Sequence, residues 1–344
     1  MGRHADAIEL GDLRLATPVI LAPMSGVTDK PFRRLVSRLG CGLVVSEMIA
    51  SEASVRAARQ AMRARKLLED YSDEGPMAVQ LAGCDPDTMA EAARIQRDRG
   101  AAIVDINFGC PVKKIVSKDA GSALMREPSL AGRILDRVAQ AVHPLPVTLK
   151  MRLGWDRDSL TAPAFARMAR DAGIRLITVH GRTRQQLYNG SADWGEVANT
   201  KRATDLPVIV NGDIGTAADV RGALAASGAD GVMIGRAACG APWRLGQVMA
   251  LLRTGRMGRA PDLAMQRDIA LEHYDALLSY YGTRRGVRIA RKHMSWYAHG
   301  LPGAAAFKRA VMAAERPEAA KALVRQLYAA AQDGGQVTIR PQAA

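Results

Sequence analysis

The segment around Cys110 holds the residues best placed for chemistry in this 344-residue chain. Cys110 lies between Gly109, which permits a close approach of the backbone, and Pro111, which fixes it. A cysteine in this setting could be a nucleophile, a metal ligand, a proton donor or an ordinary buried side chain. Asn107 offers a nearby amide, and three lysines make the following segment positive: Lys113, Lys114 and Lys118.

Lys150 ends an apolar run and is a second candidate for chemistry. A lysine that faces a protein core must be paired with an anion or have a shifted pKa. It could form a Schiff base, as in barrels of the class I aldolase type, or place a cation beside an electron-rich cofactor ring. His180 and Arg182 add a hydrogen-bond donor and a fixed cation, although an exposed basic loop is the simpler interpretation of this pair.

Glycines next to polar residues follow the last two apolar runs, as Asn211-Gly212-Asp213 and as Gly235-Arg236. In parallel barrels the loops after the seventh and eighth strands often bind phosphate through backbone N–H groups. This pattern favours a phosphorylated cofactor such as FMN, although any tight turn after a strand also uses glycine.

Eight short apolar runs precede these polar residues, and helix-like segments rich in Ala, Arg and Leu separate them. The runs cover residues 19–23, 43–48, 77–83, 103–111, 146–152, 176–182, 207–213 and 231–236. Runs rich in Val, Ile and Leu without strict alternation are typical of parallel strands buried on both faces. We therefore predict an α/β fold, a (β/α)8 TIM barrel. A doubly wound open sheet is the alternative, but no GxGxxG follows the first run.

The barrel would bring the candidate residues together, because the carboxyl ends of all its strands meet on one face, where active sites lie. The residues at these ends are Pro23, Met24, Glu47, Gln80, Asn107, Cys110, Lys150, His180, Arg182, Asn211, Asp213, Gly235 and Arg236. Polar residues also follow strands simply because loops begin there, but so varied a set favours a shared site.

Residues 255–344 have helical patterns alone, so we predict a barrel over residues 1–254 followed by a small all-helical domain over 255–344. Residues 251–344 hold 15 Lys and Arg against 7 Asp and Glu, a net charge of +8 out of +14 for the chain. Helical spacing could place four cations on one face that contacts RNA phosphates: Arg284, Arg288, Arg291 and Lys292. A solvated helix face is the alternative.

The charge, cysteine content and apolar runs of the sequence limit which partners, metal sites and cellular locations are expected. The net charge of +14 suggests an acidic partner, such as nucleic acid or an anionic surface. The four cysteines have neither CxxC nor zinc-finger spacing, so we expect no metal site and no disulfide framework. The sequence shows no signal peptide and no apolar run near the ~20 residues of a membrane span, so we expect a cytoplasmic protein.

Together these motifs closely resemble those of the tRNA-dihydrouridine synthases, particularly the bacterial B-type branch. The matching stretches are APMSGVTDKPFRRL (22–35), VSEM (45–48), VQLAGCDPDTMAEAARI (79–95), DINFGCPVKKIVSKDAGSALM (105–125), VTLKMRLGW (147–155), TVHGRTRQQLYNGSADW (178–194), PVIVNGDI (207–214), MIGRAACGAPW (233–243) and RIARKHMSWY (288–297). The resemblance runs from about residue 10 to about residue 330. Ser25 and Phe108 depart from it, since alanine and methionine are commoner at these positions in the family.

The resemblance implies an enzyme that reduces the C5=C6 bond of specific uridines in tRNA, with FMN as cofactor and NADPH or NADH as reductant. Cys110 would be the general acid that protonates C5, and Asn107 would lie near the target base. The residues expected around FMN are Pro23, Met24, Ser25, Gln80, Lys150, His180, Arg182, Asn211, Gly212, Asp213, Gly235 and Arg236. The basic helical domain would bind tRNA, and we expect a monomer.

Two other functions fit parts of this pattern. A relative of dihydroorotate dehydrogenase would reduce or oxidise a free pyrimidine with the same cofactor, but the basic C-terminal region argues against it. An RNA-binding regulator or tRNA-folding chaperone would keep the barrel and do no chemistry.

Overall fold

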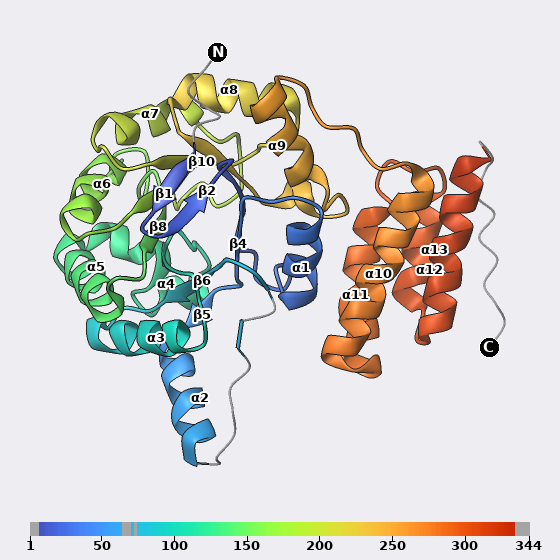
Figure 1. The fold of residues 1–344 in the computed structure, drawn as a ribbon, viewed down its shortest axis with the longest axis horizontal. Coiled ribbons are helices and arrows are strands. Elements are labelled where there is room, and N and C mark those ends of the chain that lie inside the picture. The colour runs from blue at the N-terminus through green and yellow to red at the C-terminus, as the bar shows by residue number, and fades with distance from the viewer. Residues whose placement is uncertain (1–6, 64–69, 72–73, 334–344) are drawn as a thin grey trace.

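Eight parallel strands close into a barrel in the computed structural model, which describes residues 7–63, 70–71 and 74–333 (Figure 1). The barrel strands are β3 (Val19–Leu21), β4 (Leu43–Val45), β6 (Met77–Ala82), β7 (Ile103–Phe108), β8 (Val147–Arg152), β9 (Leu176–His180), β10 (Val208–Asn211) and β11 (Gly231–Ile234). Neighbouring strands pair in parallel, and pairing of β4 with β6 completes the ring around the short β5 (Ile49–Ala50). The predicted TIM barrel is confirmed, and the open-sheet alternative is wrong.

The strands are apolar because both of their faces are covered. Every residue of β6 and of β7 is buried. In β7 the side chain of Phe108 packs edge-on against Phe165 of a surrounding helix, with ring centroids 6.2 Å apart. Because side chains alternate along a strand, Asp105 and Asn107 point the other way, into the barrel. The core thus has an apolar layer outside the barrel wall and a partly polar interior.

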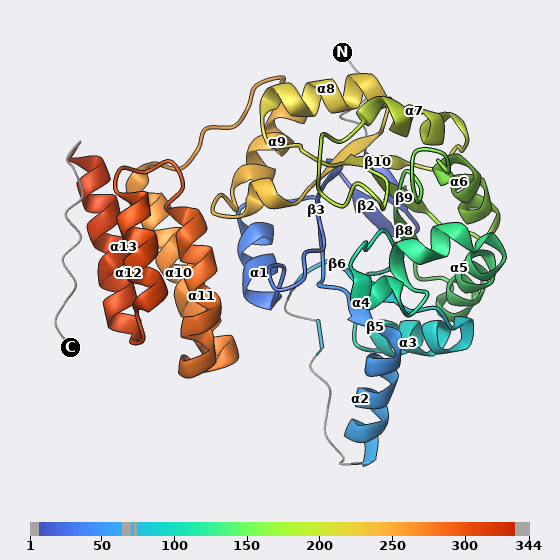
Figure 2. The same ribbon diagram turned by 180° about the vertical axis from the view of Figure 1, so that it is seen from behind.

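Helices surround the barrel, as the helix-like segments between the apolar runs predicted. The helices up to the end of the barrel are α1 (Lys30–Arg38), α2 (Ser51–Arg63), α3 (Pro86–Asp98), α4 (Lys113–Val116), α5 (Pro128–Val142), α6 (Ala162–Asp171), α7 (Trp194–Arg202), α8 (Ala217–Ser227) and α9 (Arg244–Thr254), with 3-10 turns η2 (Gly121–Arg126) and η3 (Arg236–Ala238). The sequence patterns did not single out α2, α4 or α7. Figure 2 shows α2 extending away from the barrel.

An antiparallel hairpin of β1 (Ile8–Leu10) and β2 (Leu13–Leu15) closes the amino-terminal end of the barrel. Ile8, Leu10 and Leu15 form one apolar cluster with residues near the starts of the barrel strands, such as Ile103 and Leu176. No sequence pattern predicted this hairpin. It leaves the opposite, carboxyl end of the barrel as the face open to ligands.

Four helices follow the barrel: α10 (Leu263–Tyr281), α11 (Thr283–Tyr297), α12 (Ala304–Ala313) and α13 (Pro317–Gln332). Both views show α10 and α11 lying between the barrel and the pair α12 and α13 (Figures 1 and 2). Residues 255–262, between α9 and α10, are neither helix nor strand. The four helices enclose their own apolar cluster, which also takes in Leu35 of α1 and Trp243 from the barrel side.

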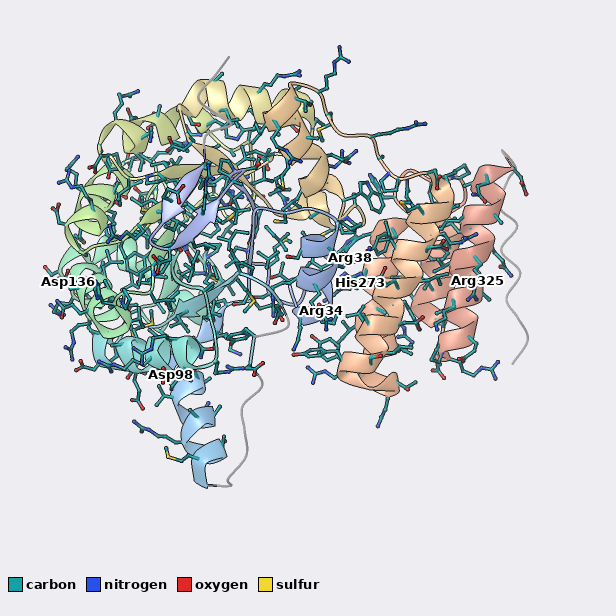
Figure 3. The ribbon with its side chains drawn as sticks, in the orientation of Figure 1. Arg34, Arg38, Asp98, Asp136, His273 and Arg325 are labelled. Atoms are coloured by element: carbon teal, nitrogen blue, oxygen red, sulfur yellow. The ribbon has the colours of Figure 1, made fainter. Side chains whose placement is uncertain are left out.

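The junction between barrel and helices is built on α1. The ring of Phe32 lies 5.4 Å from that of His273, whose pKa burial lowers to about 3, so a neutral imidazole packs against the phenyl ring. At the rim of the same junction, Arg38 forms an ion pair with Glu272 at 2.5 Å (Figure 3). The helices are therefore packed against the barrel and not merely tethered to it.

Among the described helices, none has the length and apolar character needed to cross a membrane. Over the same described ranges, no cluster of three or more His, Cys, Asp or Glu side chains is arranged to hold a metal ion.

Candidate active site

Cys110 lies just beyond the carboxyl end of β7, and its backbone is held from three sides. Its N–H donates to Asn107 Oδ1 at 2.8 Å, and its carbonyl accepts from Ser122 Oγ at 2.9 Å. Gly121 has φ +64°, and a Cβ on it would lie 2.8 Å from the Cys110 carbonyl oxygen, so only glycine fits this close approach. Cys110 itself is partly exposed. The backbone that carries the thiol is therefore fixed in place at the mouth of the barrel.

A chain of side-chain hydrogen bonds inside the barrel leads to this cysteine. Strand register places Gln80 beside Asp105 and Asp105 beside Thr148. Thr148 and Gln80 donate to the Asp105 carboxylate at 2.6 and 2.7 Å, and Asn107 Nδ2 donates to Gln80 Oε1 at 2.6 Å. Burial raises the pKa of Asp105 to about 6, although both donors oppose the shift. Gln80 and Asn107 thus connect the barrel interior to the Cys110 backbone.

Lys150 extends into the barrel from β8. Its Nζ donates to Asn211 Oδ1 of β10 at 3.2 Å, and within the described part of the chain this is the one acceptor that the ammonium reaches. Burial lowers the pKa of Lys150 to about 8, and Arg152 lowers it further, while Asp105 and Cys110 act in the opposite direction. Asn211 is oriented for this contact because its own Nδ2 donates to the Met233 carbonyl at 2.9 Å. Lys150 is thus a half-buried cation with donors to spare.

His180 is the last residue of β9, and Arg182 follows the strand, beside Asp213. Burial lowers the pKa of His180 well below its usual value, and the positive charge of Lys150 adds to this, so the imidazole is neutral. Both terminal nitrogens of Arg182 donate to the Asp213 carboxylate, at 3.1 and 2.5 Å. Partial burial raises the pKa of Asp213, but the bonds from Arg182 and other donors outweigh it and hold that pKa below the usual value.

Gly212 is required between β10 and Asp213. Its φ is +116°, and a Cβ on it would lie 2.7 Å from Ala192 Cβ and 2.8 Å from the His180 ring. Asp213 itself has φ +55°, in the left-handed region that few side chains adopt. Residues held in such conformations gather at ligand-binding sites. The backbone at the end of β10 therefore lies too close to His180 and Ala192 for any residue but glycine.

Arg152 is a residue that the sequence pattern marked only as the end of an apolar run. It is 1% exposed, and its guanidinium donates to three backbone carbonyls, those of Gly109, Thr183 and Leu187, at 2.8 to 2.9 Å. It therefore joins the Cys110 segment to the loop after β9. Leu187 has φ +50°, which is unusual for a bulky side chain. A charged residue that closes an apolar strand was the available signal.

The loop that Arg152 supports presents Tyr188 at the barrel mouth. Tyr188 is 57% exposed, and two guanidinium groups lie near its ring, with the Cζ atoms of Arg152 and Arg236 at 5.6 and 5.7 Å from its centroid. Arg236 also donates to Asp213 Oδ1 at 3.0 Å, and its side chain is 64% exposed. An exposed aromatic ring near cations is a surface suited to nucleic acid.

The other residues predicted around a cofactor flank these groups. Pro23, Met24 and Ser25 follow β3, and Gly235 follows β11, the strand paired with β3. A Cβ on Gly235 would touch Met24 Sδ at 3.5 Å, so the two loops are in contact. The structure thus brings every sequence-predicted barrel residue to one end of the barrel.

The four predicted phosphate-binding cations of α11 divide into two pairs. Arg284 and Arg288 are exposed and line a hollow of about 560 Å³ at the start of the helix. Arg291 is half-buried and donates to the Ala314 carbonyl after α12 at 2.9 Å, and Lys292 donates to the Gly26 carbonyl on the barrel. One pair therefore faces solvent, whereas the other uses its donors within the protein.

The donor set at the barrel mouth fits an anionic ligand. Four cations converge there, Lys150, Arg152, Arg182 and Arg236, against two carboxylates, Asp105 and Asp213. The neutral His180 adds no charge. An anionic ligand would offset this excess of positive charge. The phosphate of FMN is such an anion.

A closed parallel barrel with its ionisable side chains gathered at the strand carboxyl ends defines an enzyme of the (β/α)8 class. Comparison with known proteins identifies the family within this class. The model of the dihydrouridine synthase (Dus) family matches residues 20–333, so the chain belongs to the dihydrouridine synthases.

Named relatives agree over nearly the whole chain. A probable tRNA-dihydrouridine synthase of Rickettsia bellii is 50% identical over 321 residues, which are 93% of this chain and 98% of that protein. The tRNA-dihydrouridine synthase B of Xanthomonas axonopodis pv. citri is 48% identical, over 93% of this chain and 96% of its own length. That of Pseudomonas aeruginosa is 45% identical, over 95% and 98%. The resemblance read from the motifs is confirmed.

Solved structures of lower identity share the fold. Morphinone reductase in complex with tetrahydroNAD superposes with a TM-score of 0.50 at 15% identity, over 76% of this chain and 93% of that one. Histamine dehydrogenase from Rhizobium sp. 4-9 gives a TM-score of 0.54 at 12% identity, over 79% of this chain and 51% of that one. At these identities the likeness shows the barrel fold alone.

Proposed function

We propose that this protein reduces the C5=C6 bond of specific uridines in tRNA to 5,6-dihydrouridine, with FMN as cofactor, NADPH or NADH as reductant, and Cys110 as general acid. Family membership and the names of the relatives support the reaction and the substrate. The observation that carries the role of Cys110 is its fixed, partly exposed position beside the cationic barrel mouth. A thiol held there can deliver a proton to a base that enters the barrel.

The residues that would hold the cofactor lie on, or directly after, β3, β6, β8, β9, β10 and β11. The residues proposed to hold it are Pro23, Met24, Ser25, Gln80, Lys150, His180, Arg182, Asn211, Gly212, Asp213, Gly235 and Arg236. FMN, when bound, supplies the hydride that C6 of the uracil ring receives. Lys150 places a preorganised positive charge near it, and that charge stabilises negative charge without reorganisation during the reaction. Arg182 acts through Asp213, because its donors are used there and on the loop carbonyls Asn189 and Gly190.

On the substrate side, Cys110 would donate its proton to C5, where hydride addition at C6 leaves enolate character. Asn107 would contribute by holding the Cys110 backbone and by lying near the base. A uridine stacked in RNA cannot reach the barrel interior, so the nucleotide must be extruded into the mouth. The exposed ring of Tyr188 lies on that entry path beside Arg152.

We further propose the division into a catalytic barrel, residues 1–254, and a basic tRNA-binding helical domain, residues 255–344, acting as a monomer in the cytoplasm. The exposed Arg284 and Arg288 would bind the RNA backbone, and these contacts give affinity and orientation but do not read the bases. The four helices share an apolar cluster of their own, to which Leu35 and Trp243 of the barrel contribute, and this cluster supports the division.

A Cys110→Ala variant tests the proposal. Removing the general acid should lower turnover by roughly 10² to 10⁴, the usual contribution of one positioned acid. Affinity for FMN and for tRNA should stay at the level of the unaltered protein, because the Cys110 side chain holds neither. Dihydrouridine is measured by mass spectrometry of tRNA from a strain that lacks the gene, after incubation with protein, FMN and NADPH.

Two outcomes would contradict different parts of the proposal. Full turnover by the Cys110→Ala variant would remove the general-acid role and leave the reaction in place. Absence of dihydrouridine with the unaltered protein would reject the reaction itself, and tRNA binding without turnover would then favour an RNA-binding regulator or tRNA-folding chaperone.

A further inference from the structure

Two side chains from the C-terminal helices reach the segment between β3 and α1, residues 22–29, which we call the β3–α1 segment. Tyr281, the last residue of α10, donates its hydroxyl to Asp29 Oδ2 at 3.1 Å. Lys292, in the middle of α11, donates from Nζ to the Gly26 carbonyl. These contacts join positions more than 250 residues apart in the sequence. Helical spacing alone assigned Lys292 to a phosphate-binding face and gave no indication of this contact.

The β3–α1 segment has a firm base and an exposed tip. At its base, Asp29 caps α1 by accepting from the Phe32 N–H at 3.1 Å. Within it, a turn is closed by the Thr28 N–H, which donates to the Met24 carbonyl at 3.0 Å. The tip, Ser25 and Gly26, is exposed. Internal bonds therefore hold the turn, but they do not hold its tip against the barrel.

The tip is held through the backbone N–H and carbonyl of Gly26, each of which makes one hydrogen bond to a side chain. Its N–H donates to Glu47 Oε1, just after β4, at 2.5 Å, and its carbonyl accepts from Lys292. A Cβ on Gly26 would lie 3.2 Å from Lys292 Nζ, so the ammonium is closely seated on this peptide. Glu47 and Lys292 thus hold the tip from the barrel and from α11 respectively.

The same helix also packs on the loop after β11. A Cβ on Gly240 would lie 2.3 Å from the Trp296 carbonyl oxygen, so the backbones of this loop and of α11 are in direct contact. β3 and β11 are neighbours in the barrel. Helix α11 therefore touches both of the loops that carry the proposed flavin residues Met24, Ser25, Gly235 and Arg236.

We propose that Lys292 is a positioning residue for the flavin site, which holds the tip of the β3–α1 segment from α11, and that it does not serve as a phosphate contact. The inference rests on the proposed flavin-dependent function. Arg288, one turn earlier on α11, is exposed to solvent, whereas Lys292 faces the barrel. Helix α11 thus carries the RNA-binding cations in its first turns and supports the cofactor loop one turn further along.

The test compares Lys292→Met with Arg288→Met in the full-length protein. Each change removes one cation from α11 and keeps an unbranched, apolar side chain. FMN affinity is measured by adding FMN to the protein stripped of flavin and following the quenching of flavin fluorescence. Lys292→Met should weaken FMN binding about tenfold, as expected for one lost charge-assisted hydrogen bond, and should leave tRNA affinity and its salt dependence unchanged. Arg288→Met should do the reverse.

Two further variants separate positioning from general damage. Lys292→Arg keeps a donor and should recover most of the FMN affinity. Tyr281→Phe removes the hydroxyl that reaches Asp29 and should weaken FMN binding in the same direction. In turnover, Lys292→Met should lower kcat and leave the KM for tRNA unchanged.

The inference is wrong if Lys292→Met binds FMN as tightly as the unaltered protein, whatever happens to tRNA affinity. It is also wrong if Lys292→Met and Arg288→Met lose FMN affinity equally, because the contact with Gly26 would then have no specific effect. An unaltered protein that binds no FMN would instead reject the proposed function.

Discussion

At the scale of single residues, Lys150 is a group whose pKa the fold shifts enough to be measured. Its pKa is lowered to about 8, mainly by burial, whereas an unfolded lysine has a pKa near ~10.4. Below pH 8 the folded protein therefore bears the cost of a buried ammonium. This cost is consistent with a site built to receive an anion, which would offset the charge when bound.

The pH dependence of stability tests this perturbation. Between about pH 8 and pH 10.5 the unfolded chain binds more protons at this position than the folded one. The contribution of Lys150 to the free energy of unfolding therefore rises with pH over this range. Compared with Lys150→Met, the flavin-free protein should gain up to about 3 kcal/mol in its free energy of unfolding over this range. Urea unfolding of both proteins at pH 7.5 and pH 10 measures the difference, and a pH-independent difference would contradict the buried charge.

At the scale of elements, the Cys110 segment depends on the turn that follows it. Gly121, at the start of η2, has φ +64° and lies against the Cys110 carbonyl. Gly228, after α8, has the same φ but no atom within 4 Å of the place where a Cβ would lie, so it serves as a matched control. Alanine at either position should cost about 1 kcal/mol for the left-handed backbone. Only at Gly121 does the added methyl group also displace the backbone of the candidate general acid.

Gly121→Ala should therefore lower turnover at least tenfold, whereas Gly228→Ala should leave turnover unchanged, because small displacements of a catalytic group are costly. Thermal unfolding of both variants and dihydrouridine formation at a temperature well below either midpoint measure the two effects separately. Equal turnover in the two alanine variants would show that the position of Cys110 tolerates this displacement.

The elements themselves were largely predictable, but the contacts between them were not. Apolar runs such as 103–111 indicate buried parallel strands because both faces of those strands are covered. The same logic brought Cys110, Lys150 and Asn211 to one end of the barrel. Arg152 was not recognised, because the three carbonyls that it binds come from loops whose paths no sequence period records.

Helical spacing had a similar limit in α11. It grouped four cations on one face but could not tell which of them would meet solvent, because that depends on what packs beside the helix. The neighbours are the barrel, which takes Lys292, and the end of α12, which takes Arg291. The β1–β2 hairpin also went unpredicted, since its strands of three residues are too short to show a period.

At the scale of the whole molecule, positive charge is carried on both sides of the C-terminal helices. Arg284 and Arg288 lie on α11, the helix that packs against the barrel, whereas Lys308 and Arg325 are exposed on α12 and α13 (Figure 3, Arg325). Because α10 and α11 lie between the barrel and the pair α12 and α13, we expect a tRNA with one nucleotide in the barrel mouth to reach α11 first. Position, and not charge alone, should decide which cations contribute.

Changing Arg284 and Arg288 together to Ala should therefore weaken tRNA binding and reduce the slope of its salt dependence by about two, one for each lost phosphate contact. Changing Lys308 and Arg325 together to Ala removes the same charge and should leave the slope unchanged. Filter binding of tRNA to both variants over a series of salt concentrations measures the slopes. Equal losses of tRNA affinity in the two double variants would mean that tRNA binding depends on the net charge of the helices. The position of α11 would then have no specific role in binding.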